Sequence, residues 1–311
     1  MDSNLTNLGY VEETTFGTTP NANLQLLRRT GGRIAPNQTT ITSEEIRSDL
    51  RAGRPVRTSL QGGGSINVEW SYGTLDDILE GMLLESWSSD VLVDGTTKKS
   101  YTFEEQFVDS AISPSLYVTH KGARIETLSM SFALEQIVTG SFGVRAASPS
   151  VGSSSAGTGN TNPTTTGPLN TVDMITGLTE GAAGTTLSSL SRVTGIDINM
   201  SRSLHDKREL GTLAAYDIGV GRLLVGGQIQ YYLEDSTLLA AFLAFTDRAL
   251  DITLTDEDSN TIQVEIPKLK YTGQARIENP GVDSDRIVTL PFEAYADADD
   301  AALIRFTRSG S

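Results

Sequence analysis

Two sequence patterns occur in the same order in both halves of the chain, and they constrain the fold more than any other feature. The first is a glycine pair, an alternating run and, after a three-residue break, an apolar segment. The second is an Ile-Val-Thr string that ends in phenylalanine. The matching segments are residues 63–70 with 226–233, 74–83 with 237–245, and 137–142 with 287–292. This repetition predicts a duplicated domain, which can build a ring from half as many chains.

The chain divides at a segment of unusual composition. Its 311 residues suffice for two cores of ordinary size, at residues 1–147 and 171–311. Between them, residues 148–170 are a Ser/Thr/Gly-rich linker or loop, and no charge lies between Arg145 and Asp173. Because such a segment buries little apolar surface, we expect it to be flexible and dispensable for folding.

Most of the remaining chain has the period of a β-strand. Polar and apolar residues alternate at 65–70, 127–132, 251–255 and 262–266, which is typical of half-buried antiparallel strands. Residues 256–260 have the composition of a hairpin turn between the last two. They also imitate a calcium loop, but Thr261 and Pro267 stand where such a loop has glycine and glutamate.

Each half contains one amphipathic helix, expected at residues 74–86 and 237–246. Thr74 is a suitable N-cap, and Asp76 and Asp77 follow in the first turn, where the helix dipole favours acidic groups. Apolar residues then recur at helical spacing and predict a packing face. The predicted packing residues are Leu75, Ile78, Leu79, Met82, Leu238, Phe242 and Phe245.

Composition excludes several classes of function. The chain has no cysteine and only two histidines, His120 and His205, so thiolate and imidazole chemistry have almost no candidates. The glycines at 62–64 precede a strand and lack the lysine of a phosphate loop, so they predict a turn or a close backbone approach. We therefore expect no catalytic, cofactor-binding or metal-binding residues.

The net charge of −15 argues against binding nucleic acid through its phosphates, which needs a basic surface. No apolar run approaches the length of a membrane span, and the first residues do not resemble a secretion signal. The sequence therefore predicts a soluble protein made in the cytoplasm that can face DNA without holding it.

One region is basic within this acidic chain. Residues 28–57 contain seven arginines and three acidic residues, and their middle is too polar for a core element. We interpret the middle as a long exposed loop whose guanidinium groups pair with acidic surface on another copy. The alternative is a solvated loop without a partner.

Several strings near the N-terminus carry a resemblance to a known family. They are GYVEETTFGTTP at residues 9–20, SEEIRSD at 43–49 and GGSI at 63–66. With them the chain resembles tail tube (major tail) proteins of long-tailed bacteriophages, most closely over residues 9–90. The resemblance implies a mainly β fold of sandwich or barrel domains, each with one flanking helix, and no enzymatic activity.

The resemblance also implies how the protein assembles. Tail tube proteins form rings that stack into a hollow tube, usually six domains to a ring, so a chain with two domains forms a trimeric ring with pseudo-sixfold symmetry. Partners would be further copies, the tape measure protein, and tail terminator and tail tip proteins. DNA would pass through without specific binding, in a virion tail made in the host cytoplasm.

Within this interpretation, residues of the basic loop would contact the next ring. They are Arg47, Arg51, Arg54 and Arg57. Two other classes remain open: a β-rich decoration or receptor-binding protein of the virion surface that makes no tube, and a glycan hydrolase. The sequence identifies no convergent carboxylate pair for the latter.

Overall fold

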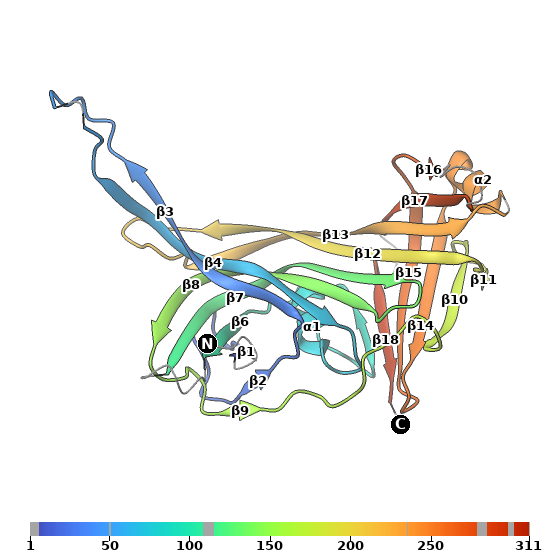
Figure 1. Ribbon diagram of the computed structural model, residues 1–311, viewed down its shortest axis with the longest axis horizontal. Helices are drawn as coiled ribbons and strands as arrows, with labels where there is room; N and C mark the ends of the chain where they lie inside the picture. The colour runs from blue at the N-terminus through green and yellow to red at the C-terminus, as the bar shows by residue number, and fades with distance from the viewer. Residues whose placement is uncertain are drawn as a thin grey trace.

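The computed structural model describes residues 6–49, 51–107, 115–234, 236–278, 285–297 and 302–310. Within these residues the chain forms eighteen strands and two helices, and all the strands join into one large sheet that is not closed into a barrel (Figure 1). The prediction of a mainly β fold is confirmed.

The elements of the first half are β1 (Thr6–Glu12), β2 (Leu24–Leu26), β3 (Gly31–Thr42), β4 (Pro55–Glu69), α1 (Asp76–Leu83), β5 (Val91–Val93), β6 (Tyr101–Phe107), β7 (Leu116–Ala133) and β8 (Thr139–Gly152). After β9 (Asn160–Thr161) come β10 (Ile175–Ala182), β11 (Ser188–Ser189), β12 (Val193–Lys207), β13 (Asp217–Tyr232), α2 (Thr237–Ala244), β14 (Arg248–Thr255), β15 (Thr261–Tyr271), β16 (Arg276–Ile277), β17 (Ile287–Ala294) and β18 (Arg305–Ser309).

The strands of the two halves pair in corresponding orders. In the first half the order is β1, β6, β7, β8, β4, β3. In the second it is β10, β14, β15, β17, β13, β12. Each strand thus has a counterpart at the same place in the chain, and each helix follows the counterpart strands β4 and β13.

The halves join edge to edge through β7 and β12. Residues 127–133 of β7 pair antiparallel with residues 195–201 of β12. This junction makes one run of eight neighbouring strands, which we call the main sheet. Its order is β3, β4, β8, β7, β12, β13, β17, β16.

One core spans both halves, because the main sheet covers it continuously. Helix α1 packs into it, and Arg202 of β12 fastens the end of that helix. The Arg202 guanidinium donates to the carbonyl oxygens of Met82 (2.6 Å) and Leu83 (3.1 Å), at the helix end where carbonyl groups lack partners within the helix. At the far side, β18 pairs with β5 of the first half and with β15 of the second. The halves are therefore packed as one body.

The helices differ from the prediction in their ends. Helix α1 begins at Asp76, its N-cap position is Leu75, and no side chain caps it. The Thr74 hydroxyl instead hydrogen-bonds Ser71 and Thr164, so it anchors a distant segment rather than the helix. Neither helix in the described chain has the length and apolar character of a membrane span.

The predicted packing residues are placed as follows. Leu75, Ile78, Leu79, Met82 and Leu238 are buried, and Phe242 is half-buried against the core. Phe245 lies outside this packing. It follows the last residue of α2 in a left-handed conformation, and the Lys270 ammonium sits 4.3 Å from its ring centroid.

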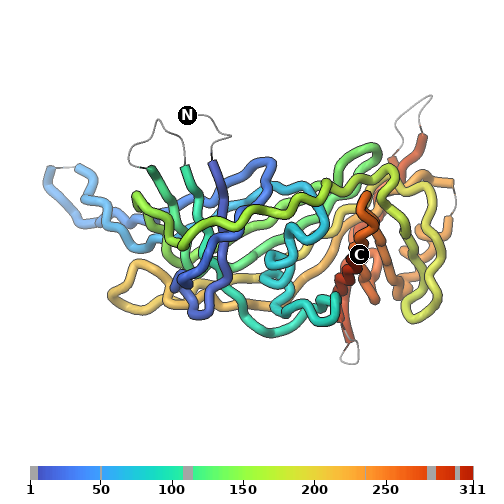
Figure 2. The backbone as a smooth tube through the Cα atoms, turned by 90° about the horizontal axis from the view of Figure 1, so that it is seen from below, coloured from blue at the N-terminus to red at the C-terminus, as the bar shows by residue number. Residues whose placement is uncertain are grey.

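The Ser/Thr/Gly-rich segment differs from the expected flexible linker. Residues 148–152 belong to β8 and pair with β7, and β9 pairs in parallel with β2. The segment then runs along the first half before it enters the second (Figure 2). Buried Glu104 holds it, since its carboxylate accepts from the Ser155 hydroxyl and the Ala156 amide, both at 2.7 Å. Composition gave no sign of these contacts, because they are hydrogen bonds and not apolar burial; outside β8 and β9 the segment is mostly an exposed or half-exposed loop.

We expect Glu104→Ala to lower the stability of the whole chain by about 2–4 kcal/mol, because it leaves several donors near the core without an acceptor. Thermal unfolding followed by circular dichroism measures the change. Glu257→Ala, which removes an exposed carboxylate, is the control. Equal melting temperatures for the two variants would show that the segment does not depend on Glu104.

The hairpin at residues 256–260 is present and is closed by Asp256. One Asp256 carboxylate oxygen accepts from the amides of Asp258 (3.0 Å) and Asn260 (2.8 Å). The side chain is thus committed to the turn. No group of three or more His, Asp or Glu side chains suited to a metal ion occurs in the part of the chain that the structure describes.

The glycines at 62–64 lie inside β4, where the backbone approaches its neighbours closely. A Cβ atom at Gly62 would lie 2.5 Å from Nδ1 of His120, and one at Gly64 would clash with the Arg33 carbonyl oxygen. His120 itself is fully buried in β7. Burial lowers the pKa of His120 to about 4, so the neutral imidazole is part of the core.

This burial predicts a pH-dependent stability. The folded-state pKa of His120 lies below its unfolded value, so its contribution is complete above about pH 6.5 and decreases as the pH falls toward 4, by up to about 3 kcal/mol. His120→Gln should flatten the fall in melting temperature over that range. His205→Gln, at an exposed histidine, should retain it. Identical slopes for both variants would contradict the assignment.

Candidate functional site

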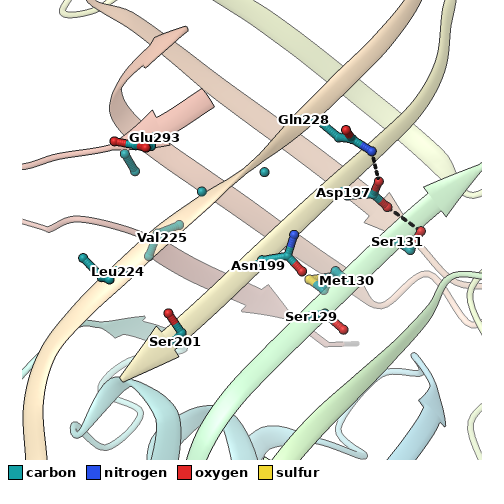
Figure 3. Close-up of a pocket in the computed structure, with 13 residues that line it drawn as sticks. Ser129, Met130, Ser131, Asp197, Asn199, Ser201, Leu224, Val225, Gln228 and Glu293 are labelled. Atoms are coloured by element: carbon teal, nitrogen blue, oxygen red, sulfur yellow. Dashed lines mark hydrogen bonds between the residues drawn. The ribbon is translucent and has the colours of Figure 1, made fainter. Parts of the chain in front are cut away.

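The main sheet has one apolar and one polar face, because its strands alternate. In β12, for example, Ile196, Ile198 and Met200 enter the core, while Asp197 and Asn199 lie on the opposite side. The same alternation holds in β7, where serines face away from the core. We call the side away from the core the polar face (Figure 3).

Residues of the polar face form rows across the paired strands of both halves. A central row runs Gly31, Asn67, Ser141, Ser129, Asn199, Gly226 and Glu293. Beside it run Glu69, Thr139, Ser131, Asp197, Gln228 and Pro291 on one side, and Arg33, Ser65, Gly143, Thr127, Ser201 and Leu224 on the other. Small polar side chains dominate, and three carboxylates accompany one arginine.

Hydrogen bonds between neighbouring strands fix this surface. The Asp197 carboxylate accepts from the Ser131 hydroxyl (2.6 Å) and the Gln228 amide (2.7 Å), which joins three strands across the junction of the halves (Figure 3). The hydroxyls of Ser129 and Ser141 lie 3.1 Å apart. The side chains therefore lie along the sheet and bond to one another, which leaves fewer groups to hold a ligand.

The centre of the polar face is an open hollow of about 810 Å³, lined by residues of β7, β12, β13 and β17. Its lining contains hydroxyl, amide and carboxylate groups, but none of its residues is a cationic side chain. A phosphate here would meet Asp197 and Glu293 without a compensating charge. The hollow is therefore an acidic surface with hydroxyl and amide groups between its carboxylates.

A second feature is the long hairpin of β3 and β4, which projects from the end of the main sheet (Figure 1). We call residues 37–61 the arm. At its tip Arg47 donates to both carboxylate oxygens of Asp49, at 3.2 and 2.9 Å. Arg51, Arg54 and Arg57 are exposed. The structure thus places all four predicted contact residues on the arm, far from the central hollow.

The arm also exposes apolar side chains that the sequence analysis did not single out. Ile41, Val56 and Ile46 are exposed, the last completely, at 100%. Isolated apolar residues are normal on surfaces, and here three of them lie on one projecting hairpin. In the sequence these residues are visible only as apolar residues within a polar segment. The pairing of β3 with β4 is what brings Ile41 opposite Val56.

The family model described as "phage tail tube protein" matches residues 3–294. The chain belongs to the phage tail tube protein family. A search of curated proteins found no match. The earlier resemblance is therefore confirmed, and it extends over nearly the whole chain rather than residues 9–90.

In this tail tube protein the N-terminal string at residues 9–20 has a structural explanation. Buried Glu13 accepts from the amides of Gly17 and Gly122, both at 2.8 Å, and from the hydroxyls of Ser100 (2.8 Å) and Thr102 (2.7 Å). Four donors from three segments meet one carboxylate. The Glu13 carboxylate of this string therefore ties three segments of the fold together.

Proposed function

We propose that the chain is the structural subunit of a phage tail tube and assembles into trimeric rings with pseudo-sixfold symmetry. Corresponding strand orders in the two halves support a duplicated domain, with each half occupying one of six similar positions. The rings stack into a hollow tube that conducts DNA into the host.

The observation that carries this proposal is the polar face. It is continuous across seven paired strands of both halves, lacks cationic side chains at its centre and has its side chains bonded to one another. In the proposed ring this face lines the bore. An acidic, hydrogen-bonded lining repels phosphate and offers no fixed attachment, so DNA stays mobile.

The arm then reaches the adjacent ring. Exposed arginines and apolar residues on one hairpin suit a mixed contact in which guanidinium groups meet acidic surface and Ile46 is buried. The ends of the tube would meet the tape measure protein and the tail terminator and tail tip proteins. The protein would be a component of the virion tail that is made in the host cytoplasm, with no enzymatic role and no cofactor.

Electron microscopy of the purified protein tests the proposal. We expect rings or tubes in negative stain, and light scattering that grows with protein concentration. Dispersed monomers that bind to intact virions would instead support the alternative of a surface decoration or receptor-binding protein.

A further inference from the structure

Both ends of the main sheet present a strand edge that pairs with nothing in the described chain. At one end β3 pairs with β4 alone, and at the other β16 pairs with β17 alone. Open edges of this kind invite pairing with another chain. If the ring of the proposed function forms, these two edges are the ends that must be joined.

The junction of β7 and β12 shows how one half meets the next within the chain. Here Ser131 lies opposite Asp197 on the polar face, and Met130 lies opposite Ile198 on the core face. Met130 and Ile198 are both buried. The junction is head to tail, because the β7 edge of one half receives the β12 edge of the other.

The ladder registers give the counterpart of each junction residue. Ser65 and Gln228 occupy the same position in the repeated pattern. Ser65 lies opposite Arg33, and Gln228 lies opposite Asp197. Arg33 therefore corresponds to Asp197. Ile34 accordingly corresponds to Ile198.

The same procedure applies at the other edge. Glu69 and Tyr232 occupy the same position in the first repeated pattern, and they lie opposite Thr139 and Ile287. The strand pairing therefore sets the two Ile-Val-Thr strings two residues out of register, since the strings alone would match Thr139 with Thr289, and we take the correspondence from the pairing. Thr139 lies opposite Ser131. In the second half, the Glu278 amide donates to the Ile287 carbonyl oxygen at 2.9 Å, so Glu278 lies opposite Ile287 as Ser131 lies opposite Thr139. Glu278 therefore corresponds to Ser131, and Ile277, the residue before it, corresponds to Met130.

From this correspondence we infer that β3 of one copy pairs antiparallel with β16 of the next, with Arg33 opposite Glu278 and Ile34 opposite Ile277. This inference rests on the proposed ring. It repeats the internal junction between chains, so that the main sheets of successive copies form one continuous sheet around the bore.

Two properties of the free edges favour this register. Ile277 points to the core side, opposite buried Val288, yet it is 47% exposed, and a neighbouring strand carrying Ile34 would cover it. On the polar face the register brings an arginine opposite a glutamate, and cross-strand pairs of opposite charge stabilise antiparallel sheets. A shift by one residue would put Ile277 opposite a polar-face residue.

Cysteine cross-linking tests the register directly, because the chain has no cysteine. Residues opposite each other in antiparallel strands have Cα atoms about 4.5–5.5 Å apart, within disulfide range. The variant Arg33→Cys/Glu278→Cys, assembled and oxidised with oxidised glutathione, should migrate as covalent dimers and trimers without reductant and as monomers with it.

Three variants control this result. Ser131→Cys/Asp197→Cys, at the internal junction, should form its disulfide within one chain and stay monomeric. Each single-cysteine variant should give no species larger than a dimer. Arg33→Cys/Glu293→Cys should not give trimers, since Glu293 lies one strand further from the edge, on β17.

Rings that assemble without trimer cross-links would overturn this register and leave the proposed function intact, whereas a wild-type protein that forms no rings would overturn both.

A second pair of variants does not depend on oxidation. Glu278→Arg should abolish ring formation, and Arg33→Glu/Glu278→Arg should restore it. Rings from the single variant equal in number to wild-type rings would also contradict the inference.

Discussion

Replacing Leu79 by aspartate is expected to unfold the protein or to prevent its soluble expression. Leu79 lies on α1 with 3% of its surface exposed, between the main sheet and the rest of the core. A carboxylate there loses its hydration without gaining a partner, and the apolar contacts of leucine are lost as well. We expect a loss above about 4 kcal/mol, a large part of the 5–15 kcal/mol that stabilises a typical domain.

Leu243→Asp is the matched control for that variant. Leu243 belongs to the other helix and is 76% exposed, so the same change should leave the melting temperature nearly unaltered. Thermal unfolding followed by circular dichroism compares the two. If Leu79→Asp melts like the wild type but no longer assembles, the α1 face is an interface between copies and not part of the core.

Reversing the charge of Arg47, Arg51 and Arg54 to glutamate should prevent tube elongation and leave each ring intact. All three are exposed in the segment between β3 and β4, outside the core, so the fold should be unchanged. Acidic arms would face the acidic surface of the next ring, since the whole chain carries a charge of −15. Assembly of the wild type should also weaken as salt rises, because exposed ion pairs are screened.

Circular dichroism and electron microscopy together measure this effect. Lys98→Glu, at an exposed cation away from the arm, should still form tubes of normal length. Normal tubes from the triple variant would show that the arm arginines are solvated. In that case Ile41, Ile46 and Val56 would be the next residues to change.

The sequence predicts those parts of the fold that depend on local patterns. Alternation located the strands around Ile66, Leu128 and Ile252, and helical spacing located the buried face of α1. It did not predict the path of residues 148–170, because Glu104 that holds them lies more than forty residues earlier. It also placed Phe245 inside a helix that ends one residue before it, at Ala244.

The candidate site could be predicted only in part, for a related reason. Ser129, Ser131, Asp197 and Asn199 each appear in the sequence as the polar member of an alternating run. That they form one surface depends on the pairing of β7 with β12, strands more than sixty residues apart. No local pattern encodes that pairing, whereas the charge of the arm is visible in composition.

Cryo-electron microscopy of tubes assembled from the purified protein tests the central claim most directly. We predict rings of three chains, six similar domains around the axis, and a bore lined by the polar face, with Ser129, Asp197 and Gln228 pointing inward. Six chains in a ring, or a bore lined by any other surface of the chain, would contradict this account.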